Sequence, residues 1–222
     1  MKPSHSVKSE GTAEVREPTR RAVLVGAGAF ALGGCATNAA TTTVANREPD
    51  PAFARKVVDY SGREAPGTIV VDPANHFLYL VQKNGQATRY GVGVGGEGFG
   101  WYGAATIHTK QEWPDWYPPK EMLERQPELK KKMAELQSGL GMAGGPGNPL
   151  GARAMYLWQG KVDTLFRIHG TVEPWTIGKS VSSGCIRMIN QDVIDLYGRT
   201  PTGTRVVVLG APSKPAPKVA RV

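Results

Sequence analysis

Short apolar runs separated by tight turns are the feature that most limits how this chain can fold. Residues 67–72, 77–81 and 87–94 are rich in Val, Ile, Leu and Tyr, and each run is too short for a typical helix. The last two runs flank Lys83-Asn84-Gly85, and Asn-Gly between apolar runs is a strong hairpin signal. The runs therefore predict neighbouring β-strands joined by hairpins.

Further runs of the same kind extend the pattern through the rest of the chain, at residues 104–109, 154–158, 164–169 and 204–209. The chain also contains 28 Gly and 17 Pro in 222 residues, which favours strands and turns over long helices. The predicted fold class is mainly β, an antiparallel sandwich or barrel with short helical insertions.

The helical insertions are expected in two places. One comprises residues 119–125, after which Pro127 opens further turns with an apolar face made of Leu129, Met133 and Leu136. The other comprises residues 191–197, with Asn190 as the N-cap and Gly198 as the stop. Both helices are short, so they decorate the β domain and do not form its core.

The first 35 residues have the character of an export signal. Arg20-Arg21 precedes an apolar stretch that is too short to span a bilayer, and this resembles a twin-arginine leader. The stretch ends at Leu32-Gly33-Gly34-Cys35, which resembles a lipobox, so Cys35 is predicted to be lipidated and to anchor the protein in the periplasm. Cleavage by ordinary signal peptidase is the alternative. Residues 36–65 are interpreted as a linker, and residues 211–222 as a disordered tail.

The distribution of charge and the spacing of His and Cys argue against a nucleic-acid-binding function and against a metal site. The formal net charge is +8, but it is spread along the chain, and only Lys130-Lys131-Lys132 forms a tight cluster. No nucleic-acid motif accompanies it, so a basic surface that meets an anionic polymer is the preferred interpretation. No His and Cys spacing typical of a metal site is present, and no cofactor is expected.

Cys185 is the candidate nucleophile, and His169 is its candidate base. His169 ends the apolar run 164–169, where a side chain can point into a cleft. Cys185 follows Gly184, which lets nearby backbone N–H groups approach a ligand, so the amides around Ser183 and Gly184 could form an oxyanion hole. In extended backbone, Arg187 lies on the same side as Cys185 and could bind a carboxylate.

Each residue taken alone is more often structural. A single Cys in a β domain is usually a small buried hydrophobic residue, and a His at a strand end usually makes a hydrogen bond. The combination of an export signal, a thiol within the predicted domain, and a His and an Arg nearby favours catalysis over these alternatives.

The motif around these residues resembles the signature of the L,D-transpeptidase (YkuD-type) catalytic domain. It comprises His169-Gly170-Thr171 followed by Ser182-x-Gly184-Cys185-Ile186-Arg187-Met188, and the similarity covers residues 66–210. The segments 148–154, 173–178 and 192–197 extend it. An ordered set of this size is far more specific than one short motif.

The resemblance implies that Cys185 attacks a tetrapeptide stem of peptidoglycan, releases D-alanine and passes the thioester to an acceptor. An amine of another stem, a lysine of an envelope lipoprotein, a D-amino acid or water would serve. His169 would move the proton, and the carbonyl of Gly170 would orient the imidazole. Substrate contacts are expected from Arg187 and also from Ser182 and Trp175.

Two alternative functions remain possible for this chain besides that of a transpeptidase. With water as acceptor, the same residues would make an L,D-carboxypeptidase, and a chain that has kept only the fold would be a peptidoglycan-binding lipoprotein. Many family members also have His where this chain has Ser183, which places general-base catalysis on His169 alone.

Overall fold

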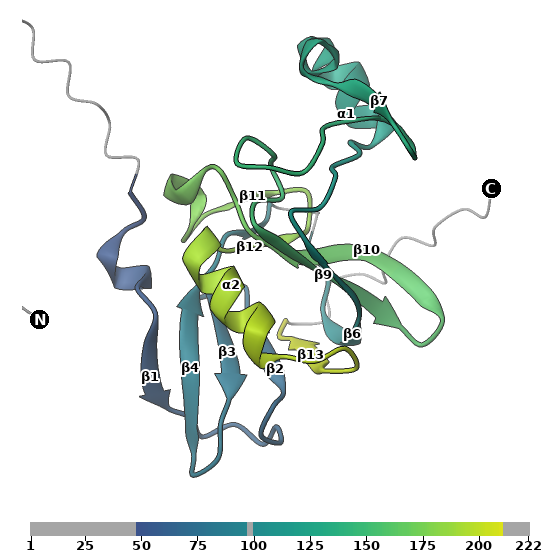
Figure 1. Cartoon of the computed structure of the whole chain (residues 1–222). Helices are drawn as coiled ribbons and strands as arrows, with labels where there is room; N and C mark the ends of the chain where they lie inside the picture. Colours follow the sequence, from purple (N-terminus) through teal and green to yellow (C-terminus); the bar gives the residue numbers. More distant parts are fainter. Residues whose placement is uncertain (1–47, 97–99, 211–222) are drawn as a thin grey trace, which may run out of the picture. The chain divides into compact units, whose positions relative to one another are not determined.

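A nine-stranded mixed sheet dominates the computed structural model, which describes residues 48–96 and 100–210. Its strands, in spatial order, are β1 (Lys56–Asp59), β4 (Gln86–Gly91), β3 (Phe77–Val81), β2 (Ile69–Asp72), β13 (Arg205–Val208), β6 (Gly103–Glu112), β9 (Arg153–Gln159), β10 (Val162–His169) and β12 (Ile186–Arg187) (Figure 1). Two small sheets pair β5 (Val94–Gly95) with β11 (Ser180–Ser182), and β7 (Ala134–Leu136) with β8 (Gly139–Gly141).

The mainly β prediction is confirmed, with one difference in strand direction. The hairpin neighbours β2, β3 and β4 are antiparallel, but β13 runs parallel to β2, and β12 runs parallel to β10. Parallel neighbours need a crossover connection, and the connection into β13 contains the helix α2 (Asn190–Arg199). Hairpin signals report only sequential antiparallel partners, so these two pairs have no local sequence signature.

The expected turn between β3 and β4 is present. Asn84 and Gly85 have φ values of 63° and 69°, in the left-handed region that Asn and Gly tolerate best. The backbone N–H of Gln82 donates to the carbonyl of Gln86 at 2.8 Å and closes the turn. This turn sets the register in which Leu78 lies opposite Tyr90, and both side chains are fully buried.

Apolar side chains from the sheet and from α2 form the hydrophobic core. Central strand β2 is buried along Ile69, Val70 and Val71, as expected for a strand covered on both faces. Helix α2 contributes Val193 and Leu196 and lies against the sheet (Figure 1). The remaining large members of the core include Leu78, Tyr90, Ile107, Met155, Leu157, Ile168 and Met188.

The helix predictions need correction in two places. Helix α2 begins at Asn190 and runs through Gly198 to Arg199, so Asn190 is not its cap and Gly198 does not stop it. The reason is that the carboxamide of Asn190 accepts a tertiary hydrogen bond from the backbone N–H of Ala152 at 2.9 Å. The second difference concerns residues 127–136, which do not form one helical face.

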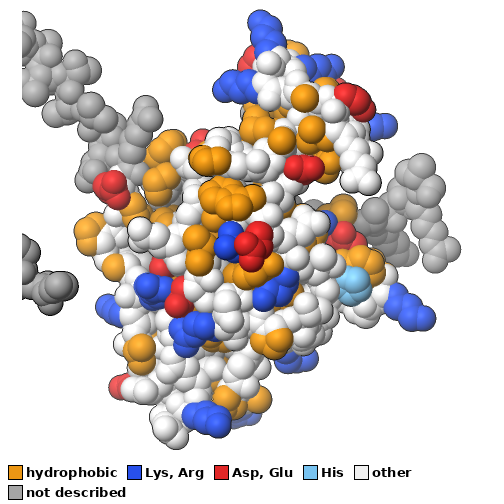
Figure 2. All heavy atoms as spheres, viewed as in Figure 1, with side chains coloured by type: hydrophobic (Ala, Val, Ile, Leu, Met, Phe, Trp, Pro, Cys, Tyr) orange, Lys and Arg blue, Asp and Glu red, His pale blue; other side chains and the backbone are white. Residues whose placement is uncertain are grey.

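Those residues belong to a segment that links β6 to β9. Helix α1 (Lys120–Arg125) agrees with the expectation, and the 3₁₀-helix η2 (Pro127–Lys132) follows it, but residues 134–136 form strand β7. Lys and Arg side chains gather at the end of the segment that contains α1 and β7 (Figure 2). Glu121 and Glu128 lie in the same two helices, so the segment is not uniformly basic.

Part of the predicted linker is folded. The 3₁₀-helix η1 (Pro51–Phe53) and strand β1 belong to residues 36–65, and β1 pairs antiparallel with β4. Strand β1 has two apolar residues only, Val57 and Val58, and this is too few for a sequence signal. The export signal with Cys35, the linker up to residue 47 and the tail 211–222 lie outside the described residues.

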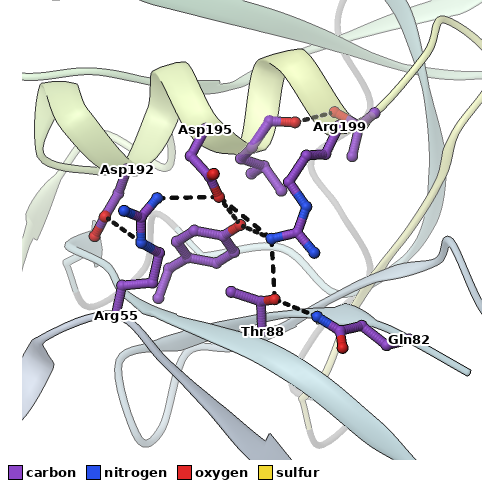
Figure 3. Close-up of polar contacts among 9 residues, drawn as sticks. Arg55, Gln82, Thr88, Asp192, Asp195 and Arg199 are labelled. Atoms are coloured by element: carbon purple, nitrogen blue, oxygen red, sulfur yellow. Dashed lines mark hydrogen bonds and ion pairs between the residues drawn. The ribbon is translucent and has the colours of Figure 1, made fainter. Parts of the chain in front are cut away.

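A polar network ties this N-terminal segment to α2 (Figure 3). Arg55 pairs with Asp195 at 3.1 Å and with Asp192 at 3.6 Å. The hydroxyl of Tyr90 donates to Asp195 at 2.6 Å, and Arg199 donates to the Tyr90 oxygen at 3.1 Å. Because Tyr90 is on β4, the network holds the helix, the sheet and the segment before β1 together.

Candidate active site

The parallel pair β10–β12 brings the predicted catalytic residues together. Ile168 lies opposite Ile186, and His169 lies opposite Arg187. The two isoleucines are buried in the core, so successive residues point to the other face of the sheet. His169 and Arg187 therefore share that face with Cys185, which immediately precedes β12.

His169 is oriented by the residue that follows it. Its Nδ1 lies 2.6 Å from the carbonyl oxygen of Gly170. A carbonyl can only accept a hydrogen bond, so Nδ1 carries the proton in this geometry and Nε2 of a neutral ring has the free lone pair. Burial lowers the pKa of His169 to about 4, and the positive charges of Arg187 and Arg167 lower it as well. The hydrogen bonds to the backbone of Gly170 and Leu150 act in the opposite direction but do not outweigh burial. The imidazole is therefore neutral at physiological pH.

Gly170 is itself fixed from behind by Asn190. A Cβ atom built on Gly170 would overlap Oδ1 of Asn190, and one on Gly151 would meet the same oxygen. The backbone N–H of Gly170 donates to the carbonyl of Arg153 at 3.0 Å. The carbonyl that orients His169 thus belongs to a peptide with no space for a side chain.

The loop before Cys185 is organised by Ser182. The Ser182 hydroxyl donates to the carbonyl of Cys185 at 2.6 Å and accepts from the N–H of Gly184 at 3.2 Å. Gly184 has a φ of 114°, which favours glycine. Buried Ser182 therefore supports the loop from inside and does not present its hydroxyl to a substrate.

This arrangement changes the expected oxyanion site. The N–H of Gly184 already has an acceptor in Ser182. Within residues 48–96 and 100–210, the structure shows no acceptor for the backbone N–H of Cys185 or of Ser183. The amides of Cys185 and Ser183 are therefore the better candidates for binding a developing negative charge.

Arg187 is engaged by a carboxylate and by the neighbouring backbone. Its Nη1 contacts Oε2 of Glu173 at 2.9 Å. Its peptide exchanges two hydrogen bonds with Gly93, of 2.8 and 2.9 Å, so the position of the residue is well defined. Glu173 precedes the 3₁₀-helix η3 (Pro174–Thr176), which also contains half-buried Trp175.

The Cys185 thiol is partly buried, and burial raises its pKa. A hydrogen bond from the backbone N–H of Arg167 and the charges of Arg167 and Arg187 act in the opposite direction, whereas Asp163 reinforces the rise. With a raised thiol pKa and a lowered histidine pKa, the resting site holds a neutral thiol and a neutral imidazole.

Comparison with known proteins identifies the family of this chain. The model of the family described as the L,D-transpeptidase catalytic domain, YkuD, matches residues 66–208. This chain belongs to that family. Two Escherichia coli proteins described as probable L,D-transpeptidases, ErfK/SrfK and YbiS, are 33% and 30% identical to it over 153 and 149 residues. Each alignment covers 66% of this chain and 45% of the relative, so the chain matches about half of their length.

A solved structure from Brucella melitensis is more similar in sequence. It is described as a probable carnitine operon oxidoreductase, CaiA, and is 56% identical, covering 72% of this chain and 96% of that one. The TM-score is 0.47. The oxidoreductase description concerns that protein, whereas the family match and the curated relatives place this chain among the L,D-transpeptidases.

Several residues of this YkuD domain near the thiol escaped the sequence analysis. Arg167 and Asp163 act on Cys185, Glu173 pairs with Arg187, and Asn190 packs against Gly170. Arg167 has a usable signal, because it stands two residues before His169 on one strand and must share its face. The others depend on contacts between distant segments.

Two further findings apply to the described part of the chain. Residues 48–96 and 100–210 contain no group of His, Cys, Asp and Glu side chains that could hold a metal ion. No helix within the same residues is long and apolar enough to cross a membrane.

Proposed function

We propose that this chain is a peptidoglycan L,D-transpeptidase in which Cys185 is the nucleophile and His169 is the acid–base residue. The observation that carries the proposal is the pairing of β10 with β12, which places both residues on one face, with Nδ1 of His169 committed to the Gly170 carbonyl. Membership of the YkuD family supports the reaction class.

The first half-reaction is acylation of Cys185. As the sulfur attacks the carbonyl of the third residue of a tetrapeptide stem, its proton moves to Nε2 of His169. The amide bond to the terminal D-alanine breaks, the leaving amine takes the proton from His169, and a thioester remains. The backbone amides of Cys185 and Ser183, which have no acceptor within residues 48–96 and 100–210, would hold the oxyanion during this step.

The second half-reaction is transfer to an acceptor. His169 takes a proton from the attacking amine, a new amide bond forms, and the protonated thiol is regenerated. An amine of a second stem gives a 3→3 cross-link, and a lysine of an envelope lipoprotein gives protein attachment. Water in place of the amine gives a tripeptide, which is the L,D-carboxypeptidase outcome.

The neutral resting pair has a consequence for the mechanism. Burial disfavours both the Cys185 thiolate and the His169 imidazolium before substrate binds. The proposed mechanism therefore has the proton move to His169 as the sulfur attacks the carbonyl. A neutral thiol is also less readily oxidised than a thiolate.

Mass spectrometry with purified muropeptides tests the proposal. Wild-type protein incubated with a tetrapeptide donor is expected to gain a thioester adduct on Cys185 and to release a dimer, an exchanged tetrapeptide or a tripeptide. The product identifies the acceptor. Cys185→Ala should give neither adduct nor product. A wild-type protein that binds muropeptides without adduct or product would indicate a binding lipoprotein instead.

The proposed setting of this reaction is the periplasmic side of the membrane, with the chain exported and anchored through a lipid on Cys35. The apolar stretch after Arg20-Arg21 and the Leu-Gly-Gly-Cys sequence support this location. Palmitate labelling of cells that express wild type and Cys35→Ser tests it. Label that persists in Cys35→Ser would contradict the anchor, whereas its loss would support it.

A further inference from the structure

Strand β10 carries a second arginine beside the Cys185 site. Arg167 precedes His169 by two residues, and alternation along a strand puts both side chains on one face. Ile168 between them is fully buried on the opposite face. The parallel register pairs Ile168 with Ile186, so one step earlier along both strands Arg167 stands beside Cys185.

Contact between Arg167 and the thiol agrees with that register. Both the backbone N–H and the guanidinium charge of Arg167 lower the pKa of Cys185, which requires the two residues to be close. One face of these two strands thus carries two side-by-side pairs. Arg167 lies beside Cys185, and His169 lies beside Arg187.

The guanidinium of Arg167 is held in place rather than solvated. Its two terminal nitrogens contact the two carboxylate oxygens of Asp163 at 2.7 and 2.9 Å, and Nη1 also donates to the carbonyl of Phe166 at 3.0 Å. It lies over the ring of Tyr156, 4.4 Å from the centroid. The side chain is 15% exposed. A planar two-point contact of this kind fixes a guanidinium far better than a single ion pair.

An irregularity in β10 creates these contacts. The register with β9 shifts between Asp163 and Arg167, and Leu165 inside the bulge has a φ of 62°. Oδ1 of Asp163 accepts from the N–H of Leu165 at 2.8 Å, so the same carboxylate secures both the bulge and the guanidinium. Bulges often re-aim side chains next to active sites.

We propose that Arg167 is a second cationic residue of the site, which stabilises the Cys185 thiolate as it forms, and that Asp163 positions it. The proposal rests on the proposed role of Cys185 as nucleophile. The charged and titratable groups that act on the thiol are Arg167, Arg187 and Asp163, and Tyr156 is also coupled to it. His169 lies on the same face by the register of β10 and β12. Both arginines lower the pKa of Cys185, and Asp163 raises it, which agrees with the geometry.

Alkylation kinetics of the thiol test the proposal without any peptidoglycan. Full-length Cys35→Ser protein, in which Cys185 is the sole cysteine, reacts with iodoacetamide across pH 6 to 10, and the rate follows the thiolate fraction. Arg167→Gln is expected to raise the apparent pKa of the thiol and to lower the rate at pH 7 by roughly tenfold, since a neighbouring cation shifts a pKa by about one unit or more. Arg167→Lys, which keeps the charge, should retain most of the reactivity.

Arg199→Gln is the matched control. Arg199 also pairs with an aspartate four residues away, Asp195, but it lies in the α2 network and not at the thiol. Its variant should alkylate like wild type. A folded Arg167→Gln protein with the wild-type profile would overturn the proposal, and so would an Arg167→Lys rate as low as that of the glutamine variant.

Asp163→Asn tests the positioning of Arg167 and serves as a second variant if Arg167→Gln does not fold. Loss of the two-point contact is expected to release the Arg167 guanidinium and to slow alkylation at pH 7, although removal of the carboxylate charge alone would lower the thiol pKa. Alkylation at or above the wild-type rate in a folded Asp163→Asn protein would overturn the positioning role of Asp163. Normal alkylation behaviour in a protein that yields no muropeptide product would contradict the proposed function while leaving the role of Arg167 intact.

Discussion

The carboxamide oxygen of Asn190 occupies the space that a Cβ atom at Gly170 would need. The same oxygen accepts the backbone N–H of Ala152 at 2.9 Å, so it is held from the β9 side as well. Because the Gly170 carbonyl orients His169, the position of this proposed base depends on a contact between the end of β10 and the start of α2. Gly170 is therefore constrained by packing as well as by hydrogen bonding.

Gly170→Ala is expected to displace Asn190 or the 169–171 backbone. We expect a loss of about 1–3 kcal/mol in the free energy of unfolding, as for other overpacked sites. Misplacement of His169 should lower kcat/KM by roughly tenfold to a hundredfold. Urea denaturation and muropeptide turnover measure the two effects. Gly198→Ala is the control, because a Cβ there meets nothing within 4 Å. A helical alanine should leave activity unchanged and stability equal or higher.

Activity should show no inflection near pH 6.5, the ordinary pKa of histidine. His169 has a pKa of about 4, so it stays in its basic form through the mildly acidic range. We expect kcat/KM to fall only as pH approaches 4. A profile of kcat/KM between pH 4 and 8 reports the pKa values of the free enzyme. A clear fall between pH 7 and 6 would contradict the neutral buried imidazole.

Folding stability should depend on the same group. Above pH 6.5 the imidazole is neutral in both the folded and the unfolded chain, so its protonation does not reduce the free energy of unfolding. As pH falls from 6.5 to 4, the unfolded chain binds a proton that the native state excludes, so the free energy of unfolding drops by roughly 3 kcal/mol. Comparison of wild type with His169→Gln by urea denaturation at pH 7.5 and 4.5 isolates the part of this pH dependence that comes from His169. An equal pH dependence in both proteins would contradict it.

Local patterns predicted the strands, and they located Cys185 and His169 as candidates, because strands and short motifs leave their signal in short stretches of sequence. Strand β3 agrees with its predicted run of residues 77–81, and the Gly184-Cys185 motif lies directly before β12. What was missed depends on distant segments. Parallel pairing of β10 with β12, the folding of β1 onto β4 and the tertiary contact of Asn190 each join parts of the chain that local periodicity treats separately.

The hydroxyl of Tyr90 should contribute to stability through Asp195. The hydrogen bond is 2.6 Å, and its loss in Tyr90→Phe would leave Asp195 with Arg55 and Arg199 alone. We expect a loss of about 1–2 kcal/mol in the free energy of unfolding, typical of a bond to a charged group. Tyr79→Phe on strand β3 is the control, because its hydroxyl has no hydrogen bond to any residue that the structure describes. Similar losses in both variants would argue against the network.

Glu173 should compete with substrate for Arg187. The carboxylate lies 2.9 Å from Nη1, so a substrate carboxylate must share or displace this contact. Glu173 is 46% exposed, and a pair this open to solvent is weak. Glu173→Gln is therefore expected to lower KM for a tetrapeptide donor by about twofold to fivefold with little change in kcat.

Arg187→Lys and Glu128→Gln complete this test. The lysine variant keeps the charge but loses the planar fork, so its KM should rise. Glu128 lies in η2 and has no hydrogen bond or ion pair with Arg187 in the described part of the chain, so its neutral variant should have the wild-type KM. A higher KM in Glu173→Gln would mean that Glu173 helps to bind the substrate, for example through an ammonium group of the stem. The carboxylate would then be part of the recognition site and not a competitor of the substrate.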